Sequence, residues 1–384
     1  MNKALRRLFS LASAILRGAS LLILLAWTIG RLFTDTFYLT QLLSWIPTVG
    51  VVCVVASMLA ASWALTVLAR GSQAQPDVLH KGRLPRLRWI AAAWWLGVTL
   101  WGMAYEHRFF VSPPAIDKSP SDLRIAFWNL GGIPSDGWLD NAHALKSDIL
   151  IVVGGGGWKP INEFQNWTSP EQVSNLRSDI FNVSARIPVL EYASTILGVS
   201  QGAGLDPRAA DGVRESRDPG RAMYMLVDVQ GTPMANLGRP LVVWVIDLPS
   251  DLSLHRADVT EEAASAVRAW KGYTMVRRED GTYGKGEPRA GFPAPDIIMG
   301  DFNIPASSAS LRTLVGGMTD AYRAAGAGYA ATWPADTPIW RLDQAFVGGE
   351  LRANAFHTRT MGTGSHALIW LDASPLRASA PMGQ

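Results

Sequence analysis

The sequence predicts two parts of different fold class: an all-α membrane domain at residues 1–111 and a sheet-rich α+β domain at residues 121–375. Three observations support this division. Hydrophobic residues make up 48% of the chain, and long uncharged runs of them lie near the amino terminus. Pro and Ser are frequent in residues 112–120, which favours a stiff extended connector. Beyond the connector, short β-rich runs alternate with Gly, Pro, Asp and Ser clusters. We expect residues 376–384 to form a tail.

Three apolar segments are long enough to cross a bilayer, and they lie at residues 12–33, 42–69 and 89–105. The first contains Arg17 and Arg31, close enough to its ends for their side chains to reach the headgroups. Residues 36–69 carry no charge, and this span can bend at Pro47. The third segment is short but rich in Trp and Tyr, which suit a membrane interface. A cleaved signal peptide is the alternative for the first segment, although two further spans follow it.

The basic residues of the short loops predict the orientation of these spans. Lys3, Arg6 and Arg7 precede the first span, and five Lys or Arg residues lie between the second and third. Because positive loops stay in the cytoplasm, we expect a cytoplasmic amino terminus in a multi-pass plasma or inner membrane protein. The chain then leaves the third span on the other side, so the α+β domain is expected to be extracytoplasmic.

Charge and composition exclude several functions for the α+β domain. Of the 35 Lys and Arg residues 11 lie before residue 112, as do only 3 of the 32 Asp and Glu residues, so the remainder has 24 basic against 29 acidic residues. This excess of acid argues against a broad basic face for nucleic acid. The single cysteine, Cys53, excludes a disulfide within the chain and a cysteine-rich zinc site, and no HExxH spacing is present.

The α+β domain contains seven β-rich runs and a few helical patterns. The clearest helix is predicted at residues 261–270, with Thr260 as its cap. Many strands with few helices predict a layered, sheet-rich domain. The predicted strands are 123–128, 149–153, 223–229, 241–246, 297–299, 345–347 and 367–371.

One of these strands ends in polar side chains. The run Gly300-Asp301-Phe302-Asn303 follows a buried strand, and in an extended backbone residues i and i+2 face the same way. We therefore expect Asp301 and Asn303 to project together, as a carboxylate and a carboxamide that hold one water. The alternative is a turn, which Asp and Asn favour for backbone reasons.

Several motifs, in order along residues 121–372, resemble the endonuclease/exonuclease/phosphatase family, whose archetype is pancreatic deoxyribonuclease. The most specific is Gly300-Asp301-Phe302-Asn303. The others are Leu123 to Asn129, Asn182 to Val189, Asp320 to Arg323, Thr332-Trp333-Pro334, Arg341 to Val347 and Gly364-Ser365-His366.

This resemblance implies a four-layer α/β/β/α sandwich and a hydrolase of phosphoester or phosphodiester bonds. By position, it implies that Asp301 is the general base and that Asn303 orients the water or the phosphate. His366 would stabilise or protonate the phosphate, and Asp343 would fix the tautomer of His366 and raise its basicity. Asn129 would contact the phosphate or a metal ion.

The sequence departs from the family pattern at the implied metal site, where the family would use Mg²⁺. The metal-binding Glu is replaced by Gly154, in a run of four glycines, and the Asp before the final His is Ser365. These changes remove anionic oxygen ligands that a hard divalent cation prefers. Asp247, where the family has His, is a candidate to restore one ligand, beside Asn129.

Two alternative functions follow from the sequence. The first is a catalytically inactive module that binds a phosphorylated ligand, which the lost carboxylates favour. The second is a serine hydrolase, because Gly198 to Gly202 fits G-x-S-x-G, although Gly, Pro and Asp follow it where a helix is needed. The expected partners are the lipid bilayer and a phosphorylated substrate of undefined type. Nucleic acid as a nuclease substrate is disfavoured by the acidic domain.

Overall fold

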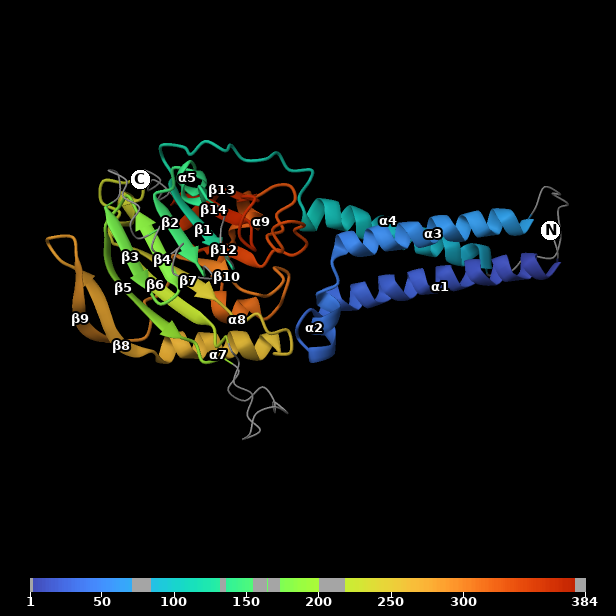
Figure 1. Ribbon diagram of the computed structural model, residues 1–384, viewed down its shortest axis with the longest axis horizontal. Helices are drawn as coiled ribbons and strands as arrows, with labels where there is room; N and C mark the ends of the chain where they lie inside the picture. The colour runs from blue at the N-terminus through green and yellow to red at the C-terminus, as the bar shows by residue number, and fades with distance from the viewer. Residues whose placement is uncertain are drawn as a thin grey trace, which may run out of the picture. The chain divides into compact units, whose positions relative to one another are not determined.

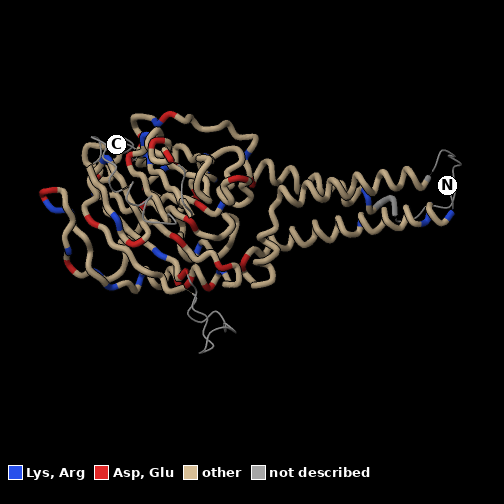
Figure 2. Tube along the Cα trace, viewed as in Figure 1, with Lys and Arg blue, Asp and Glu red and all other residues tan. Residues whose placement is uncertain are grey.

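The computed structural model describes residues 3–70, 84–131, 136–154, 164, 173–199 and 218–376. The chain forms two compact units, Met1–Phe110 and Val111–Gln384. Figure 2 shows few charged residues along the helices of the first unit and many of both signs in the second. The predicted serine of G-x-S-x-G and the glycines after Gly154 lie outside the described residues.

The first unit is helical. Its helices are α1 (Lys3–Phe33), α2 (Tyr38–Ser44), α3 (Thr48–Arg70) and α4 (Leu84–Trp101), followed by a π-helical turn at Gly102–Glu106. Helices α1, α3 and α4 pack against one another through a cluster of buried apolar residues: Leu24, Trp27, Val51, Val55 and Val98. The second predicted span is broken before Thr48, because Pro47 has no N–H to continue a helix.

Two helices of this unit are apolar and long enough to cross a membrane. They are Lys3–Phe33, with a mean hydropathy of 2.0, and Thr48–Ala69, with 2.3. The third predicted span coincides with α4 and the π-helical turn. Within the described residues, this segment is not among the helices that are both long and apolar enough to cross a membrane. Crossing by α4 therefore stays a prediction.

The second unit contains two β-sheets, which face each other (Figure 1). The six-stranded sheet has the order β13 (Leu351–Arg359), β14 (Leu368–Pro375), β1 (Leu123–Asn129), β2 (Ile149–Val153), β4 (Phe181–Ala185) and β3 (Ser174–Ser178). The eight-stranded sheet has the order β11 (Thr319–Asp320), β12 (Asp343–Val347), β10 (Ile297–Asp301), β7 (Leu241–Asp247), β6 (Arg221–Val227), β5 (Val189–Ile196), β8 (Lys271–Arg277) and β9 (Tyr283–Ala290).

Three apolar layers hold this unit together. The largest lies between the sheets, where alternate residues of facing strands, such as Phe127 and Met299, are fully buried. A second layer packs α7 (Arg256–Ala269) and α8 (Leu311–Val315) on the outer face of the eight-stranded sheet. The third packs α5 (Trp138–His143) on the outer face of the six-stranded sheet. The short helix α9 (Ala321–Ala325) and a 3-10 turn at Ala235–Leu237 complete the unit. The predicted four-layer α/β/β/α sandwich is confirmed.

The predicted helix start at Thr260 is wrong. Helix α7 begins at Arg256, after His255, and the Thr260 hydroxyl donates to the carbonyls of Arg256 and Ala257 inside the helix. The Arg256 guanidinium is buried and donates to the carbonyls of Pro249 and Asp251, which fixes the earlier start.

Candidate active site

Four of the predicted site residues meet at the strand ends between the two sheets. Asn129 ends β1, Asp301 ends β10 and Asp343 begins β12, and all three lie on the inner faces of their sheets because their i±2 neighbours belong to the inter-sheet core. His366 lies in the segment before β14. All four side chains are buried, with Asp301 at 1% and His366 at 6% exposure.

Gly300 brings β10 close to its neighbour β7. Its φ is +153°, and a Cβ built at this position would lie 1.9 Å from the carbonyl oxygen of Ile246. Only glycine fits this contact without a shift of the backbone. The glycine of the Gly-Asp-x-Asn motif therefore positions Asp301 at the end of the strand.

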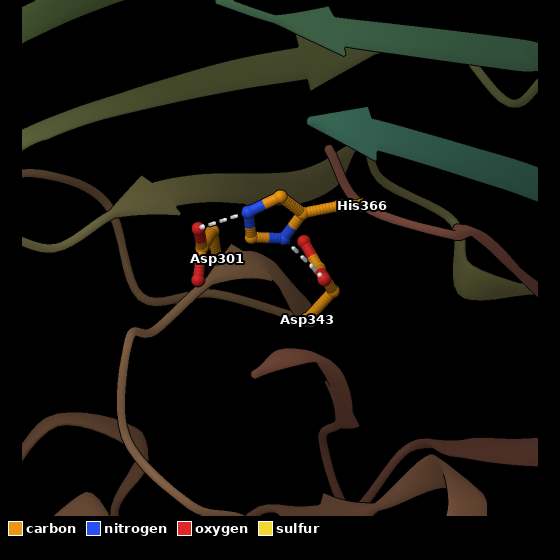
Figure 3. Close-up of side chains that lie close together, drawn as sticks. All are labelled: Asp301, Asp343 and His366. Carbon is orange, nitrogen blue, oxygen red and sulfur yellow. Dashed lines mark hydrogen bonds and ion pairs between the residues drawn. The ribbon is translucent and has the colours of Figure 1, made fainter. Parts of the chain in front are cut away.

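His366 lies between two carboxylates (Figure 3). Its Nδ1 is 2.9 Å from Oδ2 of Asp343, and its Nε2 is 3.7 Å from Oδ2 of Asp301. The backbone at His366 is held in place as well, since its carbonyl accepts a hydrogen bond from the Trp128 indole at 3.0 Å. The Asp343 contact selects the tautomer with hydrogen on Nδ1, which leaves Nε2 directed at Asp301.

Burial and the neighbouring charges raise the pKa of Asp301, and the neighbouring carboxylates raise the pKa of His366 against the effect of burial. Burial alone would lower the pKa of His366, but the charge and hydrogen bond of Asp343, with the charges of Asp301 and Asp247, raise it to about 9. Burial, and then the negative charge of Asp343, raises the pKa of Asp301 to about 6. At neutral pH the imidazole is therefore mainly a cation and Asp301 is mainly ionised.

Asn129 locks Asp301 in one orientation. The Asn129 Nδ2 donates to Oδ2 of Asp301 at 2.9 Å, and the Gly131 N–H donates to Oδ1 of Asn129 at 3.0 Å. These two bonds fix the amide with its nitrogen towards Asp301. Asn129 is thus placed to orient the carboxylate, in addition to its predicted contact with phosphate or metal.

Asn303 adopts the turn geometry that the sequence offered as the alternative to an extended backbone. Strand β10 ends at Asp301, and Asn303 has a left-handed φ of +48°, so the expected extended i, i+2 arrangement is wrong. The Asn303 N–H donates to Oδ1 of Asp301 at 2.9 Å, and its Nδ2 donates to the Leu248 carbonyl at 2.7 Å. Asn303 therefore supports Asp301 through its backbone, and its side chain anchors the segment after β7.

Asp247 ends β7 and pairs directly with Asp301 on the neighbouring strand. Its side chain shares the inner face with Asp301, because Val245 and Met299 both belong to the inter-sheet core. It is only partly buried. Burial, together with the charges of Asp301 and Asp218, raises the pKa of Asp247 well above its usual value.

Thr332 is a site residue whose role the sequence did not predict. Its Oγ1 accepts the backbone N–H groups of Leu342 and Asp343, both at 3.1 Å, and its carbonyl accepts the N–H of Ala367 at 2.8 Å. It therefore ties the backbone at Asp343 to the segment that carries His366. The Thr-Trp-Pro motif marked the position, but not these bonds.

The described side chains fit a divalent cation on only one side of the site. Gly154, where the resemblance implies Glu, supplies no ligand, and Ser365 has no carboxylate. Asp301 and Asp343 of the eight-stranded sheet form a buried group with His366, whose ligand atoms all lie within 4.8 Å of one another, and Asp247 pairs with Asp301 on the next strand. Carboxylate oxygens are the donors that Mg²⁺ and Ca²⁺ prefer, so the donor set is suitable.

Comparison with solved structures finds similar chains at low identity. An endonuclease/exonuclease/phosphatase family protein from Bacteroides thetaiotaomicron is 13% identical, with a TM-score of 0.43 over 67% of this chain and 100% of that one. D. rerio TDP2, complexed with single strand DNA product, is 14% identical, with a TM-score of 0.43 over 66% of this chain and 99% of that one. An inositol polyphosphate 5-phosphatase domain of SPSynaptojanin, in complex with inositol (1,4)-bisphosphate and calcium ion, is 12% identical, with a TM-score of 0.38 over 66% and 85%.

A comparison with curated proteins gives no match. Residues 192–365 match the family model described as the Endonuclease/Exonuclease/phosphatase family. This segment includes Asp247, Asp301, Asn303 and Asp343 and ends immediately before His366. The match confirms the resemblance seen in the motifs: residues 192–365 are similar to the Endonuclease/Exonuclease/phosphatase family.

Proposed function

We propose that the protein is a membrane-anchored, extracytoplasmic hydrolase of phosphoester or phosphodiester bonds that depends on a divalent cation. The observation that carries this proposal is the buried arrangement of Asp301, His366 and Asp343, a carboxylate and an imidazolium 3.7 Å apart with a second carboxylate behind the ring. An acid and a base that lie this close together suit proton transfer.

In this mechanism Asp301 accepts a proton from a water molecule, whose oxygen attacks phosphorus while the bond to the leaving oxygen breaks. His366, as the imidazolium, donates a hydrogen bond to the developing negative charge and then a proton to the leaving oxygen. Asp343 stabilises this imidazolium, and Asn129 holds the carboxylate of Asp301 in place. A cation bound beside Asp301 would neutralise phosphate charge.

The candidate spans α1 and α3 support the membrane anchor, and the basic loops support the extracytoplasmic placement of the second unit. An anchored enzyme favours a substrate near the membrane surface. The excess of acidic residues after residue 111 disfavours long nucleic acid.

The replacement of the family Glu by Gly154 favours a second candidate, a module that binds a phosphorylated ligand without turnover. The two functions are separated with the full-length protein in detergent micelles, a chromogenic phosphodiester or phosphomonoester, and Mg²⁺, Mn²⁺ or Ca²⁺. We expect turnover that falls at least 100-fold in Asp301→Asn and in His366→Gln. Binding of a phosphate ester with no turnover under any of these conditions would establish the module instead.

A further inference from the structure

Four charged side chains form a row across neighbouring strands of the eight-stranded sheet. Asp343 of β12 pairs with Asp301 of β10, Asp301 pairs with Asp247 of β7, and Asp247 pairs with Arg221 of β6. Directly paired residues share a face and lie on strands about 4.8 Å apart. The residues two positions further into these strands belong to the inter-sheet core, so the row lies where that core ends.

This row carries more negative than positive charge. Three carboxylates lie in this row beside the imidazole of His366 and a single guanidinium, that of Arg221. Arg221 also pairs with Asp179 at 2.7 Å and with Asp218 at 3.4 Å, so its charge is shared with two further acids. A phosphate ester is itself an anion, and its approach to this row is unfavourable unless a cation accompanies it.

The facing sheet does not supply the site that the family pattern implies. Strand β2 ends at Val153, and Gly154 follows with a φ of +70°. A Cβ built at Gly154 would lie 3.2 Å from Oδ1 of Asn129, an oxygen that already accepts the Gly131 N–H. Within the described residues, the ends of β1 and β2 thus offer an amide and a glycine, and no carboxylate.

The carboxylates of the row differ in their access to a hydrated ion. Asp343 is completely buried and bonded to His366, whereas Asp247 is partly exposed. Mg²⁺ keeps several of its waters when bound, and it therefore needs a site with solvent on one side. Of the row, the pair Asp247 and Asp301 is the one that combines two carboxylates with access for solvent, and this access is through Asp247, since Asp301 is buried.

We propose that the divalent cation site is displaced to the eight-stranded sheet, where Asp247 and Asp301 are its anionic ligands and Asp247 takes over the charge missing at Gly154. This inference rests on the proposed function, because it concerns the cation of the same site. His366 and Asp343 then stay free of the metal and remain available as the proton-transferring pair. The chemical class of the ligand is a hard, hydrated divalent cation, Mg²⁺ or Mn²⁺.

The test measures Mn²⁺ binding directly, without substrate, by the loss of the electron paramagnetic resonance signal of free Mn²⁺. The full-length protein in detergent micelles is compared with Asp247→Asn, Asp301→Asn and the control Asp258→Asn. Asp258 lies on α7 with a 61% exposed side chain, so its substitution removes the same charge away from the site. We expect Mn²⁺ affinity to fall at least tenfold in both site variants and to stay within twofold in the control.

The inference is overturned if the unsubstituted protein binds no Mn²⁺, or if Asp247→Asn binds it as tightly as Asp258→Asn. Circular dichroism and thermal melting of each variant show whether it is folded, and Asp301→Asn provides the second variant should Asp247→Asn unfold. Turnover is measured on the same samples. If the unsubstituted protein turns over substrate and Asp247→Asn binds Mn²⁺ with unaltered affinity, the displaced site is refuted and the hydrolase stands. If Asp247→Asn loses Mn²⁺ binding but the unsubstituted protein shows no turnover, the hydrolase alone is refuted.

Discussion

The substitution Asp343→Asn tests the acid–base pair through its pH dependence. In the unsubstituted protein, general-base action by Asp301 requires a pH above its pKa of about 6, and proton donation by His366 requires a pH below its pKa of about 9. We therefore expect a bell-shaped dependence of kcat/KM on pH. A cation bound at Asp301 moves both limbs below these two values, because it stabilises the ionised carboxylate and opposes the charge of the imidazolium.

The magnitude follows from the same pKa. The rise for His366 from an ordinary 6.5 to about 9 corresponds to about 3 kcal/mol in favour of the imidazolium. Asp343 supplies the largest favourable part of it, while Asp301 and Asp247 supply the rest. Asp343→Asn keeps the shape of the side chain and removes its charge, so we expect the alkaline limb to move down by more than one pH unit.

Folding stability should fall as the pH rises through the pKa of His366. Because the pKa of His366 is raised in the folded state, its contribution is fully present below about pH 6.5 and is lost as the pH rises through about 9. In Asp343→Asn this loss should occur at lower pH and be smaller. Thermal melts between pH 6 and 10, together with NMR titration of the imidazole assigned with His366→Gln, measure both effects independently of turnover.

An alkaline limb at the same pH in Asp343→Asn as in the unsubstituted protein, with an unchanged imidazole titration, would refute the assignment of Asp343 as the partner of His366. The control is Glu350→Gln, which removes a carboxylate with 66% exposure, paired with Arg239. This variant should keep both limbs of the profile, because a surface pair is screened by solvent.

Three further predictions concern the fold and the cation. Gly300→Ala places a Cβ 1.9 Å from the Ile246 carbonyl and should lower the melting temperature by on the order of 10 °C, whereas Gly317→Ala, with nothing within 4 Å, should change it little. Asp372→Asn leaves the buried Arg124 guanidinium, now bonded at 2.7 Å, without its counter-charge and should cost about 3 to 5 kcal/mol in the free energy of unfolding. Chelation by EDTA should abolish turnover, and added Mg²⁺ should restore it; turnover that survives EDTA would contradict the dependence on a divalent cation.

Much of the sheet framework was predictable from the sequence because its central strands are continuous apolar runs. Strand β2 has the predicted bounds, β7 extends the predicted run by Asp247, and β10 extends it by Gly300 and Asp301. Such runs are typical of strands buried on both faces. The edge strand β9 and its neighbour β8 were not predicted, because they are partly exposed and mix Gly, Lys and Arg with apolar residues.

The residues of the site were predictable in type but not in geometry. Gly300-Asp301-Phe302-Asn303 is specific enough to mark its position, and the structure places Asp301 beside His366. The left-handed turn at Asn303 and the anchoring of Asp343 by Thr332 depend on contacts with segments distant in the chain. The row that ends in Asp247 depends on strand order, which a single sequence does not contain.

The most direct test of the central claim, that Asp301 activates water for attack on phosphorus, is hydrolysis of a chromogenic phosphodiester in H₂¹⁸O by the full-length protein. We expect mass spectrometry to find one ¹⁸O atom in the phosphoryl product and none in the phenol that leaves from the chromogenic ester. Product formation should be lost in Asp301→Asn. Label in the phenol, or unchanged labelling and rate in Asp301→Asn, would contradict the account.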